Sequence, residues 1–383
     1  RINGIIDAAD QQDAIGVLHK KGLIVIAVRE EKSKKLRDQG VKLDDLVVFS
    51  RQLATMVESG ITLVQALHIL SEQAENKILS SVTLKIKEDI ESGSSLHEAL
   101  GKHPKIFSNL YMNMVKAGET SGMLDEILDR LSTYLEKSAA LQRKVQSSLV
   151  YPAVVISMAI IITVVLLIKV VPTFQGIFAS LGGTLPLPTQ ILILISDTLR
   201  RMFLFVVAGF FALGFAFKKY IDTPRGRYQF DYQSLRLPIF GPLLRKVVVA
   251  KFSRTLATLV KSGVPILNAL EIVGRTSGNV VVEKAVNDAR NSIREGEPIS
   301  EPLGRSGAFP PMVVRMIAVG EQTGQLEKML NKISDFYDEQ VDAAVSGLTS
   351  MIEPLVIGFL GIIIGGIVVA LFMPIFKMTE LIK

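Results

Sequence analysis

The residue types that usually carry out catalysis are scattered in this sequence. The four histidines, His19, His68, His97 and His103, stand in separate predicted helices or loops, and there is no cysteine. The sequence contains neither an H-E-x-x-H metal motif nor a G-x-x-x-x-G-K-[ST] phosphate-binding loop. A lone helical histidine is more often a packing or surface residue than a ligand. We therefore expect no catalytic residue, no metal and no cofactor, so any work must be powered by another molecule.

A G-E-x-[ST]-G motif occurs twice and is the sharpest polar signal. Its glycines predict backbone positions that need conformational freedom. Each glutamate is expected near the N-terminus of the following helix, where the helix dipole favours a carboxylate. A helix–helix corner explains the motif, and a metal or partner contact at the first glutamate is the alternative. The residues are Gly118, Glu119 and Gly122, and Gly320, Glu321 and Gly324.

Positive charge is concentrated between residues 218 and 280, which hold eleven Lys or Arg against three Asp or Glu. Membrane topology and lipid headgroups explain this excess. An acidic protein partner is the alternative, and no motif supports direct binding of nucleic acid. The candidate docking surface for a partner is formed by Arg245, Lys246, Lys251 and Arg254.

Two stretches of the chain are copies of each other. Residues 49–67 read FSRQLATMVESGITLVQAL and residues 252–270 read FSRTLATLVKSGVPILNAL, with eleven of the nineteen positions identical. The register continues through the two G-E-x-[ST]-G motifs to Pro152 and Pro354. Such self-similarity is the signature of a duplication. Each copy has a polar helical part followed by a long apolar run.

Apolar residues recur with helical spacing from residue 41 onward, which predicts six antiparallel helices in each copy. Thr62 with Gln65 and Ser95 with Glu98 are capping-box patterns that open two of these helices. The first 40 residues instead predict a small strand–helix–strand segment. Because the chain begins with arginine rather than methionine, we expect its natural start to lie further upstream.

Three apolar runs predict membrane-spanning helices, in a chain that is 49% hydrophobic yet 21% charged. Residues 145–168 and 355–376 contain no charged residue and exceed the length that a span requires. The run 202–217 is short, at about 24 Å. We expect its helix to begin near Thr189, with Arg200 and Arg201 snorkelling to the interface.

Small residues recur along two of these runs and predict close helix packing among the protein's own spans rather than dimerisation. They are Ala208, Ala212, Ala216, Gly361 and Gly365. Lys169 lies near the end of the first run, where snorkelling explains it better than ion transport.

The predicted fold class is an all-α membrane protein with two homologous cytoplasmic six-helix bundles, three transmembrane helices and a small α/β N-terminal segment. Basic residues flank the first two spans, so the positive-inside rule places both bundles in the cytoplasm. The expected boundaries are the N-terminal segment and linker, 1–40; bundle 1, 41–150; transmembrane helix 1, 151–172; external loop and helix start, 173–200; transmembrane helix 2, 201–218; basic connector, 219–246; bundle 2, 247–352; transmembrane helix 3, 353–376; and external tail, 377–383.

The chain resembles the PilC/GspF family of inner-membrane platform proteins. The FSRQLATMVESG and FSRTLATLVKSGVP copies, the two G-E-x-[ST]-G turns and the spans beginning at Pro152 and Pro354 carry the resemblance. The segments FYDEQVDAAVSGLTSMIEPLVIG and ALFMPIFKM are closer to the pilus branch than to the secretion branch. The resemblance implies a multi-pass protein of the bacterial inner membrane.

The same resemblance implies a non-enzymatic function: coupling cytoplasmic ATPases to pilin insertion or extraction in type IV pilus biogenesis. The implied partners are cytoplasmic hexameric secretion or pilus ATPases, pilins, other inner-membrane pilus assembly proteins, membrane lipids and further copies of the chain. A platform component of a type II secretion pseudopilus is the alternative. A small membrane transporter and a membrane-anchored enzyme are the other classes considered.

Overall fold

The computed structural model describes residues 15–16, 18–19, 40–181, 185–238 and 240–381. The chain divides into two units, Arg1–Val41 and Lys42–Lys383, and the helices below belong to the second. The predicted strand–helix–strand segment lies outside the described residues, apart from the few positions just given. Every element in the described ranges is a helix.

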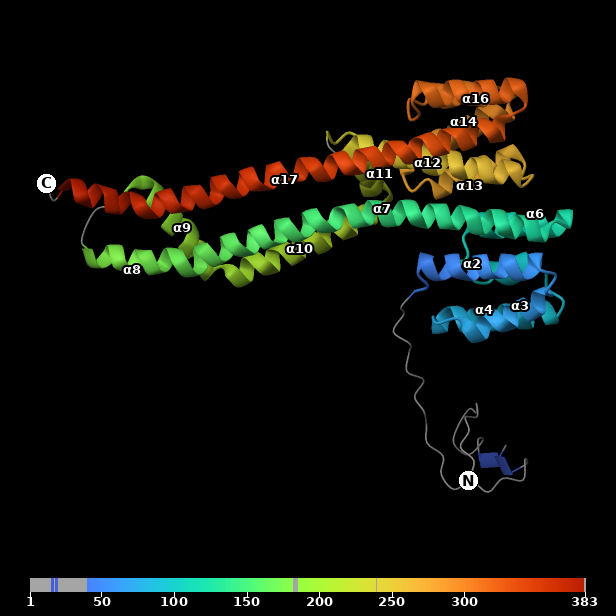
Figure 1. Cartoon of the computed structure of the whole chain (residues 1–383), viewed down its shortest axis with the longest axis horizontal. Coiled ribbons are helices and arrows are strands. Elements are labelled where there is room, and N and C mark those ends of the chain that lie inside the picture. Colours follow the sequence, from blue (N-terminus) through green and yellow to red (C-terminus); the bar gives the residue numbers. More distant parts are fainter. Residues whose placement is uncertain (1–14, 17, 20–39, 182–184, 239, 382–383) are drawn as a thin grey trace. The chain divides into compact units, whose positions relative to one another are not determined.

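The first bundle is built from six helices, as its apolar spacing predicts (Figure 1). Thr62 and Ser108 begin two of them by accepting a hydrogen bond from the backbone N–H three residues on. Gly122 ends the helix that Ser108 begins, with a φ of 73°, the left-handed conformation typical of a helix C-terminus. The helices are α2 (Leu43–Glu58), α3 (Leu63–Gln73), α4 (Lys77–Glu91), α5 (Leu96–Gly101), α6 (Asn109–Ser121) and the first part of α7 (Leu124–Val165).

The second bundle repeats the first helix for helix. It consists of α12 (Phe240–Lys261), α13 (Ile266–Thr276), α14 (Val280–Arg294), α15 (Ser300–Arg305), α16 (Pro311–Thr323) and the first part of α17 (Leu326–Leu381). The buried Phe49 ring lies 6.0 Å from Phe107, and the equivalent Phe252 lies 4.5 Å from Phe309. The two copies therefore have matching aromatic cores, which confirms the predicted duplication.

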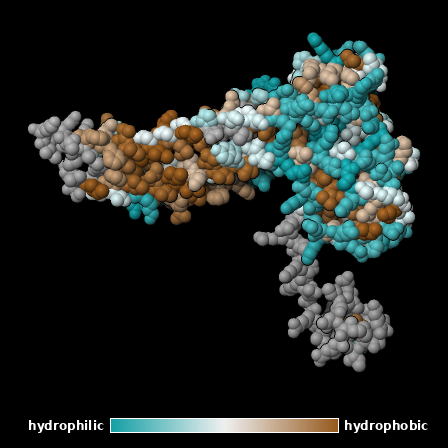
Figure 2. Space-filling model, in the orientation of Figure 1, coloured by the Kyte–Doolittle hydropathy of each residue, from teal (hydrophilic) through white to brown (hydrophobic). Residues whose placement is uncertain are grey.

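Within the described residues, three helices are long and apolar enough to cross a membrane. The first runs within Leu124–Ile177, the second is Phe203–Ile221 and the third is Pro354–Pro374. Helix α7 continues through Pro152 into a π-helix, η1 (Leu166–Val170), and then into α8 (Val171–Leu181). The surface of the region that contains these helices is mostly apolar (Figure 2).

Two details of the predicted spans are wrong. The expected loop over residues 173–190 is helical as far as Leu181, because a continued helix satisfies the backbone in lipid and lets Phe174 pack against Phe372. The helix expected to run unbroken from near Thr189 is divided at Met202 into α9 (Leu187–Arg201) and α10 (Phe203–Ile221). Helix α9 packs against η1 and α17, whereas α10 has no buried residue. The break at Met202 separates the packed helix from the exposed one.

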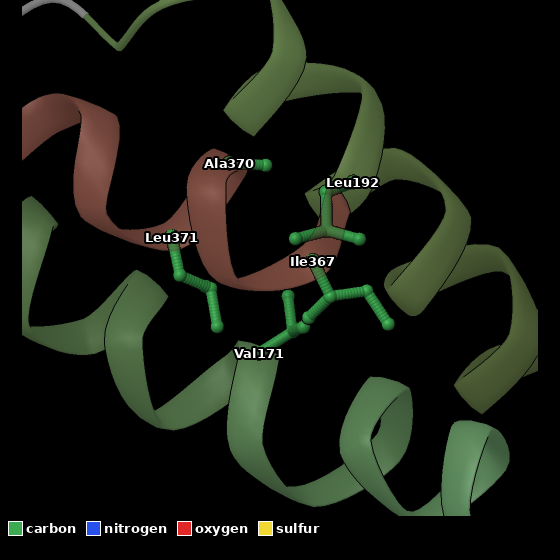
Figure 3. Close-up of a cluster of buried hydrophobic side chains, with 5 residues drawn as sticks. All are labelled: Val171, Leu192, Ile367, Ala370 and Leu371. Carbon is green, nitrogen blue, oxygen red and sulfur yellow. The ribbon is translucent and has the colours of Figure 1, made fainter. Parts of the chain in front are cut away.

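The apolar helices have a small core of their own. Side chains from α8, α9 and α17 converge in it: Val171, Leu192, Ile367, Ala370 and Leu371 (Figure 3). The Thr189 hydroxyl donates to the Ala370 carbonyl, and the Ser196 hydroxyl donates to the Leu167 carbonyl at 2.5 Å. These contacts hold α9 against the first and third apolar helices. A basic connector containing α11 (Pro224–Ser234) then leads from α10 to the second bundle.

Candidate functional site

Each glutamate of the G-E-x-[ST]-G motifs caps a short helix that precedes it in the chain. Glu119 accepts hydrogen bonds from the backbone N–H groups of Leu96 and His97, at 2.5 and 3.2 Å. Its carboxylate also lies 2.6 Å from Nδ1 of His97. Glu119 thereby satisfies donors at the start of α5 that have no partner within that helix.

Glu321 makes the same type of contact in the second copy. Its carboxylate accepts from the backbone N–H of Ile299 at 2.6 Å and from the N–H of Ser300 at 3.4 Å, at the start of α15. The prediction that these glutamates serve the following helix is therefore wrong. The receiving helix lies about twenty residues earlier, and no local pattern identifies a partner at that separation.

The first glycine of each motif is needed for close helix packing rather than for a special backbone conformation. Gly118 and Gly320 lie inside α6 and α16, and only Gly122 and Gly324 have positive φ. A Cβ on Gly118 would lie 3.1 Å from the Cβ of Ile127. One on Gly320 would lie 2.9 Å from the Cα of Leu326, in the next helix. The motif is thus a tight corner in which the glutamate fastens a third helix.

The four basic residues of the predicted docking surface do not form one surface. Arg245 is exposed and donates to the Leu235 carbonyl at 3.1 Å, while Lys246 reaches the Gln340 side chain at 3.2 Å. Both line a cleft of about 490 Å³ on the second bundle. Lys251 does not line it, and burial lowers the pKa of its amine.

Arg254 belongs to the interior, so its assignment to a docking surface is wrong. Its side chain is only 6% exposed and forms an ion pair with Asp338. The equivalent Arg51 binds the longer Glu136 with two nitrogens, Nε at 2.6 Å and Nη2 at 2.8 Å. Asp338 contacts only Nη2, and Nε and Nη1 of Arg254 are buried without a hydrogen-bond partner in the described part of the chain. The equivalent arginine therefore makes more hydrogen bonds in the first copy than in the second.

The predicted small-residue packing within the chain is also wrong. An added Cβ at Gly361 or Gly365 would meet no heavy atom within 4 Å, and both residues are exposed. The alanine face of α10 is exposed too, at Ala208, Ala212 and Ala216. Helix α17 turns a neighbouring face, with Ile367 and Leu371, toward the other apolar helices. The contacts of α17 with the other apolar helices are therefore made by that neighbouring face, which includes Ala370, and not by Gly361 or Gly365.

The interface between the two bundles is the feature that sequence reasoning missed. Helix α7 packs against α2 of its own copy and against α12 and α17 of the other. The Tyr134 phenol lies 3.1 Å from the Thr255 hydroxyl, and Lys137 lies 3.5 Å from Asp335. Lys144 pairs with Asp342 in addition. The Lys–Asp pairs are solvent-exposed and stabilise by at most about 1 kcal/mol each. The available signal was the difference between equivalent positions, such as Tyr134 against Phe336.

The described residues contain no cluster of three or more His, Asp or Glu that could hold a metal ion. His97 contacts Glu119, His68 lies 3.7 Å from Glu72, and neither pair includes a third titratable ligand. What the structure offers is a pair of helical bundles with exposed clefts, joined to apolar helices. The fold defines a duplicated helical protein whose described residues include three helices long and apolar enough to cross a membrane.

The chain belongs to the family described as "Type II secretion system (T2SS), protein F", which it matches over residues 49–172 and again over residues 252–374. It is 46% identical to a "Type IV pilus assembly protein PilC" of Thermus thermophilus, over 98% of this chain and 94% of the relative. It is 44% identical to the protein of the same name in Myxococcus xanthus, over 99% and 92%. A "Type II secretion system protein F" of Vibrio cholerae is 32% identical, over 99% and 96%. These matches confirm the predicted family and its internal repeat.

Proposed function

We propose that this chain is a non-enzymatic platform protein of the bacterial inner membrane that takes part in type IV pilus assembly. Relatives that carry the pilus assembly name are 46% and 44% identical to it, against 32% for the secretion protein of Vibrio cholerae. That difference favours the pilus. A platform role in type II secretion is the second candidate, because the secretion relative also covers nearly the whole chain.

One structural observation supports a platform that transmits force. Each bundle ends in a helix that continues without interruption toward the membrane: α7 (Leu124–Val165) from the first and α17 (Leu326–Leu381) from the second. At 1.5 Å per residue these helices are about 63 and 84 Å long. A partner that displaces either bundle therefore also moves the attached apolar helix.

The energy for this work must enter through contact, since the sequence has no phosphate-binding loop. We assign the bundles to the cytoplasm on the basis of the Lys and Arg residues that flank the first two spans. There a soluble ATPase of the pilus machine can reach them, while pilins and other inner-membrane assembly proteins meet the apolar helices. The proposed docking position for the ATPase is the cleft that Arg245 and Lys246 line.

Deleting the gene and imaging surface filaments tests the platform role. We expect the deletion strain to lack type IV pili, and normal filaments would refute the role. Loss of a secreted enzyme with filaments intact would favour the second candidate.

Binding measurements on the purified chain test the docking position. It should hydrolyse no ATP by itself and should bind the ATPase in a salt-sensitive manner. The double variant R245E/K246E should weaken that binding while membrane insertion is retained. The matched control K284E/R294E changes the charge equally on exposed positions of α14 and should bind normally. Normal binding by R245E/K246E would show that this cleft is not the docking position.

A further inference from the structure

The contact between the two copies is unequal, because one corner is covered and its counterpart is not. In the first copy, the corner between α6 and α7 forms one side of a cleft of about 480 Å³. The turn between α12 and α13 forms the other side, with Ser262 and Val264 both buried. The Arg130 guanidinium donates to the Lys261 carbonyl across this contact. Tyr134, further along α7, is only 7% exposed beneath α12.

The counterpart corner of the second copy, between α16 and α17, is open. Phe336 stands where the first copy has Tyr134, and it is 42% exposed. Val319, the counterpart of Ala117, is 50% exposed. Together with Arg315 and Met329, Val319 lines an apolar cleft of about 500 Å³. In the described residues this cleft has no lining from the first copy.

The turn that would fill this corner is likewise free. It is the turn between α2 and α3 of the first copy, the counterpart of the α12–α13 turn. Ser59 is exposed at this turn and Gln52 is exposed on α2 before it, whereas their counterparts Ser262 and Thr255 are buried under α7. Each chain therefore has one unused turn and one unused corner of the kind that already bind each other within it.

The free turn and the free corner have more complementary charges than the turn and corner that bind each other within the chain. The free turn carries Glu58 where the occupied turn carries Lys261. The free corner carries Arg315 and the exposed Lys332, the counterpart of Arg130. An acidic turn and a basic corner attract one another, and exposed apolar side chains such as Val319 would add affinity if a docked partner covered them.

The long helices of the two copies run in the same direction, which is compatible with both copies entering one membrane. Lys137 pairs with Asp335 and Lys144 with Asp342, so the pairs advance in the same direction along α7 and α17. These helices are therefore parallel (Figure 1). Repeating the same relation would place the spans of the next chain alongside those of the first, with the same orientation.

We propose that the α2–α3 turn of one chain docks into the α16/α17 corner of a second copy of the same chain. The contact is head-to-tail, so each added chain presents a new free turn or corner, and closure into a ring depends on the rotation between subunits. This proposal rests on the internal contact and is independent of the proposed function.

Cysteine cross-linking of the full-length chain in native membranes tests this contact, since the sequence has no cysteine of its own. Ser59→Cys and Val319→Cys are the informative positions, because their counterparts Ser262 and Ala117 line one cleft. When the two single variants are co-expressed with different tags, a short bis-maleimide should join one to the other. Neither variant alone should cross-link to itself. Absence of the mixed product, or equally strong self-linking of Ser59→Cys, would overturn the proposal.

Charge reversal tests the register of the contact. Glu58→Lys on the Ser59→Cys chain should lower the cross-linked fraction several-fold, and Lys332→Glu on the Val319→Cys chain should restore it. Glu88→Lys, an exposed position on α4, is the matched control and should leave the fraction unchanged. Undiminished cross-linking with Glu58→Lys would contradict the proposed pairing.

Discussion

Glu119 and Glu321 show how one side chain can join three helices. Each stands on one arm of a tight corner and holds the start of a third helix with backbone hydrogen bonds. Removing a carboxylate in this position leaves part-buried N–H groups without an acceptor. These residues therefore contribute to stability.

Replacing Glu119 by alanine should lower the stability of the first bundle. We expect a loss of about 1 to 3 kcal/mol, because two backbone donors and the His97 contact lose their partner. Thermal unfolding of the detergent-solubilised chain, followed by far-UV circular dichroism, measures this. Glu88→Ala, on an exposed face of α4, is the control and should melt like the wild type. Equal melting of both variants would show that the cap is unimportant.

Asp338→Glu should stabilise the second copy. The added methylene lets the carboxylate reach Nε of Arg254, which is buried without a partner, as Glu136 does for Arg51. A charge-assisted hydrogen bond regained in this way contributes about 1 to 2 kcal/mol. A rise in melting temperature is expected for Asp338→Glu but not for the same change at the exposed Asp335. A fall would mean that the buried site lacks room for the longer side chain.

Tyr111 makes the first bundle sensitive to alkali. It is fully buried, and burial raises the pKa of its phenol from 10.0 to about 12. The folded state thus favours the neutral phenol, so the stability from this group is complete below pH 10 and is lost as the pH rises toward 12. Tyr111→Phe removes the hydrogen bond from Ser50, so the free energy of unfolding should fall by about 1 kcal/mol at neutral pH. Between pH 10 and 12 the stability of this variant should decline less steeply than that of the wild type. An equally steep decline would contradict this account.

At the scale of elements, the tight corners depend on glycine where two helices nearly touch. A methyl group at Gly320 would lie 2.9 Å from the backbone of Leu326, so the start of α17 would have to move. Gly320→Ala should therefore destabilise the chain by about 1 to 3 kcal/mol despite the better helix propensity of alanine. Gly347→Ala, in open space on α17, should be neutral or slightly stabilising. Comparable melting of both variants would show that the corner yields easily.

The sequence was sufficient for the elements whose signals are local. Apolar spacing and the repeat predicted twelve bundle helices and three apolar spans, and the described part of the chain contains both sets. Contacts across long separations were out of reach, which is why the targets of Glu119 and the burial of Arg254 were missed. Neither the continuation of α8 nor the break at Met202 has a strong local signal, since both follow from packing against η1 and α17. The exposure of Gly361 likewise depends on which face of α17 its neighbours fill.

At the scale of the whole molecule, duplication gives the protein two similar bundles on two parallel helices, and their contact is unequal. One α-helical connection leads from each bundle into the apolar region. The first bundle has its corner covered by the second, while the corner of the second is open. In the proposed function a motor acts on the two bundles, and the open corner is where we propose that a further copy docks.

If the proposed function is correct, displacement of a bundle reaches the membrane through a continuous helix. The most direct test inserts about six Gly and Ser residues between Ser147 and Ser148 of α7, where the helix leaves the first bundle, so that the connection becomes flexible. The variant should insert in the membrane and bind the ATPase like the wild type, yet its cells should lack surface filaments. An insertion of seven helix-forming residues, which keeps the helix continuous and nearly in phase, is the control and should retain more filaments. Wild-type numbers of filaments with the flexible insertion would contradict the account.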